Sequence, residues 1–242
     1  MKFNLFKKER PKIIVKSPAE YYHNNINEVI DITRYPEWMK ELKSLASTSP
    51  QNILSSDKFV YGNAKNCPAI IDILKNTLSI KSPADMIFEY RVVNGKISYR
   101  FICPWKLFLH PHDLENQAGP NSILNQYYVN TKIVTPFKIY SNQNLKLIYL
   151  DPWLHTYNLI NVIPGLVELT PKFSFDLNVN YLIPKEYVKD GLIVKINKGD
   201  VLAYLYPIDV KAKDIEIISE FVTEEINQPR FSFVNDYFKR TK

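Results

Sequence analysis

One short segment of the sequence, His110-Pro111-His112-Asp113, gathers side chains that bind metal ions. Two imidazoles and a carboxylate form the facial triad that holds iron in non-haem oxygenases, and His155 offers a further, distant imidazole. The usual oxygenase pattern is His-x-Asp followed by a distant His and an Arg, but no arginine lies between Arg100 and Arg230. Pro111 would also interrupt a strand. We therefore favour a polar loop here, and keep a metal site of His110, His112 and Asp113 as the alternative.

A second segment, Asp151-Pro152-Trp153-Leu154-His155, places a carboxylate, an aromatic ring and an imidazole within five residues. On a strand, Trp153 and His155 would share one face, as needed to grip a sugar or another small ligand. Tryptophan is also an ordinary residue at protein interaction surfaces. Trp153 and His155 are therefore the candidate ligand-binding residues, and an ordinary aromatic surface is the alternative.

The catalytic motifs with fixed spacing are missing from the sequence. It contains no Gly-x-Gly-x-x-Gly, no Walker-type phosphate loop, no Gly-x-Ser-x-Gly and no His-Glu-x-x-His. Lys198-Gly199-Asp200, with a single glycine between two apolar runs, is typical of a turn. We expect no cofactor, and the sequence leaves open whether the protein is an enzyme.

The positive charge of the 242 residues, formally +6, lies at the two ends of the sequence. Residues 1–10 carry a net charge of +3 and residues 239–242 another +3, so the rest is neutral overall. A groove that follows phosphates needs basic groups clustered on the folded body, and only six of the 31 basic residues are arginine. We therefore expect no nucleic-acid partner, except through the basic tails. The expected partner is another protein or a second copy of the chain.

The sequence shows no sign of a membrane span or a secretory signal. No stretch approaches the roughly 20 apolar residues of a membrane helix, and residues 1–8 lack the apolar run of a signal peptide. Two cysteines, Cys67 and Cys103, cannot form a disulfide-dense scaffold. We expect a protein that folds in a reducing cytoplasm and has no membrane partner.

Short β-branched and aromatic runs separated by turn residues predict an all-β fold, a mainly antiparallel sandwich or jelly-roll-like barrel with a few short peripheral helices. The clearest signal is Asn94-Gly95 between the runs 86–93 and 96–102, which predicts a type I′ hairpin. Residues 173–181 alternate strictly between apolar and polar side chains, which predicts a strand with one buried face.

Helices are expected only at the periphery. Pro36 and Pro68 suit the first position of short helices, and the apolar spacing over about 214–225 predicts a helix in the tail. The expected organisation is an N-terminal extension with a basic tail (1–35), a β-sandwich or jelly-roll domain (36–212) and a C-terminal helical tail (213–242).

Several short motifs resemble a group of uncharacterised proteins encoded by tailed phages of marine bacteria, the T4-like cyanophages among them. The similarity covers roughly residues 35–210, and its motifs are 65–74, 80–86, 171–173, 183–184, 196–203 and 206–207. The resemblance implies a phage-related origin and a β-rich fold, but no activity that could be assigned to particular residues.

The function that we expect from these observations is a non-enzymatic viral binding protein or a virion or assembly component, located in the host cytoplasm or the virion. The alternative is a metal-dependent jelly-roll enzyme of cupin or oxygenase type, or a binder of a small ligand.

Overall fold

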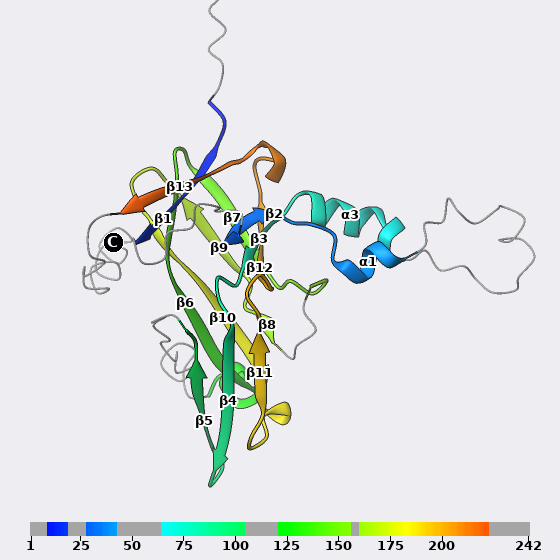
Figure 1. The fold of residues 1–242 in the computed structure, drawn as a ribbon, viewed down its shortest axis with the longest axis vertical. Helices are drawn as coiled ribbons and strands as arrows, with labels where there is room; N and C mark the ends of the chain where they lie inside the picture. The colour runs from blue at the N-terminus through cyan, green and yellow to red at the C-terminus, as the bar shows by residue number, and fades with distance from the viewer. Residues whose placement is uncertain (1–8, 19–27, 43–63, 105–120, 156–159, 223–242) are drawn as a thin grey trace, which may run out of the picture.

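The β-branched and aromatic runs form strands that build three sheets (Figure 1). The structure, a computed structural model, describes residues 9–18, 28–42, 64–104, 121–155 and 160–222. The strands within these ranges are β1 Lys12–Pro18, β2 Ile30–Ile32, β3 Leu78–Lys81, β4 Met86–Val93, β5 Lys96–Ile102, β6 Tyr128–Ser141, β7 Leu145–Leu150, β8 Asn161–Val162, β9 Gly165–Leu169, β10 Phe175–Pro184, β11 Ile193–Ile196, β12 Val201–Pro207 and β13 Glu216–Val222. The all-β prediction is confirmed.

Two sheets have five strands and one has three. Sheet A has the order β13-β1-β6-β10-β8, sheet B the order β2-β3-β12-β7-β9 and sheet C the order β11-β4-β5. All pairs are antiparallel except β1 with β13. The long strands β6 and β10 run through the middle of the molecule, with sheet B beside their upper part and sheet C beside their lower part in Figure 1.

A single main core joins the three sheets, because each sheet turns one apolar face inward. Alternation along β10 buries Leu177, Val179, Tyr181 and Ile183, as the strict apolar–polar pattern predicts. The same cluster contains apolar side chains from every sheet, including Ile13, Val15, Leu78, Ile80, Met86, Phe88, Leu147 and Leu205. Cross-links follow this packing: the Tyr90 hydroxyl lies 3.2 Å from the Thr131 hydroxyl, and the Tyr181 hydroxyl donates to the Leu202 carbonyl at 3.2 Å.

Short helices cover part of the other face of sheet B. They are α1 Glu37–Glu41 and α3 Pro68–Lys75, while α5 Ile123–Tyr127 precedes β6. Pro68 is the first residue of α3, as expected, whereas Pro36 is the extended residue that caps α1. Three short 3-10 turns complete the described elements: η4 Ala64–Asn66, η5 Lys185–Tyr187 and η6 Ala212–Asp214. A second, smaller core forms between helices and sheet, from Met39, Leu74, Leu154 and Tyr204.

The predicted hairpin is confirmed in detail. Strands β4 and β5 pair from Val93–Lys96 to Ile87–Ile102, and the turn has positive φ at both Asn94 (51°) and Gly95 (74°). Two positive φ angles are what a type I′ turn requires. Gly199 also has a positive φ, 89°, which agrees with a turn at Lys198-Gly199-Asp200.

Two expectations about the ends of the chain are wrong. Residues 12–18, assigned to an extension, form β1 in the interior of sheet A, between β6 and β13. Residues 216–222, assigned to a helical tail, form strand β13, which pairs with β1 from Lys12–Glu216 to Pro18–Val222. Isoleucine and valine are β-branched and suit a strand whatever their spacing, and pairing with a distant strand overrides a local helical pattern.

Within the described ranges, no helix has both the length and the apolar character needed to cross a membrane.

Candidate functional site

The candidate residue His155 lies in a turn after β7, and its imidazole points to the fully buried Tyr204 of β12. The Tyr204 hydroxyl forms a hydrogen bond with His155 Nδ1, and the two rings meet edge to face, with centroids 5.6 Å apart. A hydrogen bond with the Arg34 backbone favours the protonated imidazole, so the partner there is the Arg34 carbonyl. His155 thus connects the turn after β7 with the segment between β2 and α1.

The protonation states of this pair follow from burial and partners. Burial lowers the pKa of His155, the Arg34 carbonyl opposes this, and the positive charge of Lys81 lowers it further. Burial and the nearby carboxylate of Asp151 raise the pKa of Tyr204, while a hydrogen bond from the Leu154 backbone N–H lowers it. Tyr204 therefore accepts from Leu154 and donates to His155 Nδ1. His155 is neutral, with its remaining proton directed to Arg34.

The turn that carries His155 is fixed at several further points. The indole N–H of Trp38 in α1 donates to the Leu154 carbonyl at 2.9 Å, and the backbone N–H of His155 donates to the Pro152 carbonyl at 2.7 Å. Asp151 accepts from the Val162 N–H at 2.8 Å, and burial raises the pKa of this carboxyl while that bond opposes the shift. This turn, residues 151–155, is hydrogen-bonded to α1, β8 and β12, and we call it the platform.

Trp153 lies on this platform and points away from it. Its neighbours Pro152 and Leu154 are buried, whereas Trp153 is 50% exposed. Residues 153–155 form a turn rather than a strand, so the strand on which Trp153 and His155 would share one face is not present there. The His155 side chain is bonded to the buried Tyr204, whereas the Trp153 side chain is exposed to solvent.

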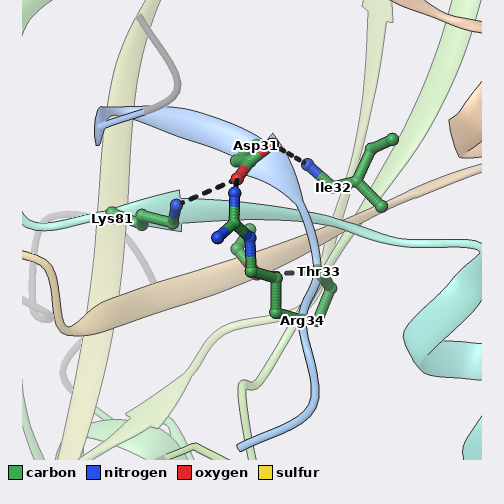
Figure 2. Close-up of polar contacts among 6 residues, drawn as sticks. Asp31, Ile32, Thr33, Arg34 and Lys81 are labelled. Carbon is green, nitrogen blue, oxygen red and sulfur yellow. Dashed lines mark hydrogen bonds and ion pairs between the residues drawn. The ribbon is translucent and has the colours of Figure 1, made fainter. Parts of the chain in front are cut away.

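A second polar cluster is centred on Asp31 of β2 (Figure 2). The register places Asp31 on the face of sheet B that also carries Tyr204. Asp31 Oδ2 accepts from Lys81 at 3.3 Å and from Arg34 at 3.0 Å, and Asp31 Oδ1 accepts from the Ile32 N–H at 2.8 Å. The Asp31 side chain is 13% exposed and that of Lys81 20%, while that of Arg34 is 78% exposed. Because the charge of Lys81 also acts on His155, the two clusters are electrostatically linked.

Three buried hydroxyls continue the network beneath these charges. Thr77 lies 2.9 Å from the Ile73 carbonyl and 2.9 Å from the Thr33 hydroxyl, which lies 2.8 Å from the Ser79 hydroxyl. A hydroxyl has one proton, and a carbonyl only accepts. Thr77 therefore shares its proton between the Ile73 carbonyl and the Thr33 hydroxyl, and either Thr33 or Ser79 donates in the bond between those two. The network ties β2 and β3 to the end of α3.

The polar atoms of the site form hydrogen bonds with one another, and we call these bonds the internal locks of the site. Both nitrogens of His155, both oxygens of Asp31 and the hydroxyl of Tyr204 are engaged as described above. A general base or a metal ligand needs a lone pair that faces a substrate or an ion. His155 would have to give up Tyr204 or Arg34 to become a ligand.

The other metal candidates, His110, His112 and Asp113, lie outside the described residues. Among the residues that are described, no group of three or more His, Cys, Asp or Glu side chains is arranged to hold a metal ion. Sequence reasoning missed Asp31, Lys81 and Tyr204, since they come from three strands and no local motif connects them. The alternation that places Ser79 and Lys81 on one face of β3 is a sequence signal for Lys81 alone.

No protein-family model matches the chain, and neither the curated proteins nor the solved structures that were compared with it give a match.

Proposed function

We propose that this protein is a non-enzymatic, phage-type β-sandwich protein that works by binding another protein or a second copy of itself. Its place would be in the host cytoplasm or in the virion, as a virion or assembly component. The support for the phage origin is the resemblance of motifs such as 65–74 and 196–203.

The observation that carries the binding role is the contrast between Trp153 and the residues that surround it. The charged and polar groups of the site are used internally, while the indole of Trp153 is half exposed on a turn that hydrogen bonds fix from three sides. A rigid aromatic side chain loses little conformational entropy when it binds. Tryptophan and arginine are also the residue types that most often dominate the energy of interfaces.

Arg34 supplies the second element of this surface. Its side chain is 78% exposed and its guanidinium uses one nitrogen for Asp31, which leaves further N–H donors for a partner. The Arg34 backbone is held by His155, two residues from Trp153 along the chain. We refer to Trp153 and Arg34 as the Trp153 surface.

The experiment is size-exclusion chromatography with light scattering on the purified chain over a range of concentrations, combined with metal analysis by mass spectrometry. We expect a metal-free oligomer whose dissociation constant rises about 30-fold or more in Trp153→Ala, the effect of losing an interface residue worth about 2 kcal/mol. Tyr187→Ala, which removes an exposed aromatic ring from η5, should change it less than twofold.

A monomer that contains near-stoichiometric transition metal, lost in His112→Ala, would contradict the proposal. It would favour the metal-dependent enzyme instead.

A further inference from the structure

The outer face of sheet C differs from the rest of the molecular body in its charge. Side chains alternate along its strands, so one face packs on the main core and the other faces outward. The register of the three strands places ten side chains on the outer face: Ile87, Glu89, Arg91, Val93, Lys96, Ser98, Arg100, Ile102, Ile193 and Lys195.

This face carries a formal charge of +3, although residues 11–238 are neutral overall. Four of its side chains are basic and one, Glu89, is acidic. Glu89 pairs with Arg91, whose side chain is still 56% exposed. Lys96 and Arg100 are exposed, and Arg100 lies directly opposite Glu89 in the neighbouring strand. The neutral total charge of residues 11–238 therefore includes a basic face of sheet C, whose charge is balanced by acidic residues elsewhere.

Exposed aliphatic side chains lie among these cations. Val93 is 62% exposed, Ile193 54% and Ile102 42%. Ile87 lies between Ile102 and Lys195 in the register. Charged side chains alone would suffice to keep such a face soluble. Apolar side chains between them provide the area that a bound protein would bury.

We propose that the outer face of sheet C binds an acidic segment of a partner protein. Carboxylates of that segment would pair with Arg91, Lys96 and Arg100, and its apolar side chains would cover Ile102 and Ile193. Arginine matches a carboxylate with two parallel hydrogen bonds, which gives such a contact orientation as well as charge.

Two other occupants fit this face less well. A second copy that docks through the same face would place +3 against +3, which repels. Single-stranded nucleic acid is held by aromatic rings that stack on bases, and this face has no aromatic side chain.

The inference rests on the proposed function only in assuming that the protein works through its surfaces, and it concerns a face separate from the Trp153 surface. The probe is a fluorescent 12-residue peptide of alternating glutamate and valine, measured by fluorescence anisotropy at 50 and 200 mM salt. We expect binding that weakens at the higher salt concentration, because ion pairs at a surface are screened. Lys96→Glu/Arg100→Glu should weaken it at least tenfold.

The matched control is Lys146→Glu/Lys172→Glu, which makes the same change of charge at two exposed residues outside sheet C and should alter binding less than twofold. Circular dichroism checks that each variant folds, and Lys96→Glu alone replaces the double variant if that one does not. Absence of peptide binding, an equal loss in the control, or tighter binding of a 12-nucleotide DNA than of the peptide would each overturn the proposal. Trp153→Ala should leave peptide binding unchanged, so failure here is distinguishable from failure of the proposed function.

Discussion

Acidification should destabilise the protein through His155. In the folded state this imidazole accepts a hydrogen bond from Tyr204, donates to the Arg34 carbonyl and lies near the positive charge of Lys81. A second proton would face the Tyr204 hydroxyl and add a charge beside Lys81. The carboxylate of Asp151 is near enough to raise the pKa of the Tyr204 phenol.

The sign and size of the effect follow from proton linkage. The pKa of His155 is lowered in the folded protein from the ordinary value of 6.5, so the unfolded chain binds the proton more readily. The stability that His155 contributes is complete above about pH 6.5 and is lost as the pH falls below it. While only the unfolded chain is protonated, each pH unit costs at most about 1.4 kcal/mol. For a chain of this length that corresponds to roughly 3–6 °C in Tm.

The assay is urea unfolding of the wild type and of His155→Gln at several values between pH 5.5 and 7.5. Glutamine can accept from Tyr204 and donate to Arg34, but it does not titrate. Other titrating groups contribute equally to both proteins, so the difference in unfolding free energy isolates His155. We expect this difference to fall with decreasing pH, in favour of the variant. A difference that is flat, or that moves toward the wild type in acid, would refute the assignment of a buried neutral imidazole.

Three further substitutions test the locks and the turn. Tyr204→Phe removes the hydroxyl between the Leu154 N–H and His155 Nδ1 and leaves both unpaired, so it should cost about 2–4 kcal/mol, measured by urea unfolding at pH 7.5. A loss under about 0.5 kcal/mol would contradict this bonding scheme. Asp31→Asn leaves Lys81 and Arg34 without their carboxylate and should lower Tm by a few degrees, with a smaller loss at 1 M salt, whereas a loss independent of salt would point to packing. Gly95→Ala keeps open space around the new Cβ but strains a residue at φ 74°, so it should cost about 1–2 kcal/mol in thermal unfolding, and an unchanged Tm would show that the turn adapts.

The local patterns of the sequence predict those elements whose cause is local. Asn94-Gly95 specifies a turn because few residue pairs tolerate positive φ at both positions, and the hairpin forms there. Pro68 begins α3 because a first helical residue needs no N–H partner. The alternation before Tyr181 predicts a strand with one buried face, and that face is buried.

Elements that depend on a distant partner are not predicted. The spacing of Ile215, Ile218 and Val222 fits a helix, and only pairing with β1 makes β13 a strand. The site has the same origin, since Asp31, Lys81 and Tyr204 meet only because β2, β3 and β12 are neighbours in sheet B. The residue types of segment 151–155 made Trp153 and His155 candidate ligand-binding residues. Which of its side chains points inward depends on the turn at residues 153–155, which the residue types do not predict.

The pairing of β1 with β13 has a consequence for how the chain folds during synthesis. β1 is made well before its partners, because its parallel neighbour lies about 200 residues later in the sequence and its other neighbour, β6, more than 100 residues later. At about 5–20 residues per second, β1 waits on the order of 10 s or longer for the last strand of its sheet. Contacts over such separations form slowly because a long loop must close first. During this interval both edges of an apolar strand are available to other chains, which exposes β1 to chaperones or to aggregation.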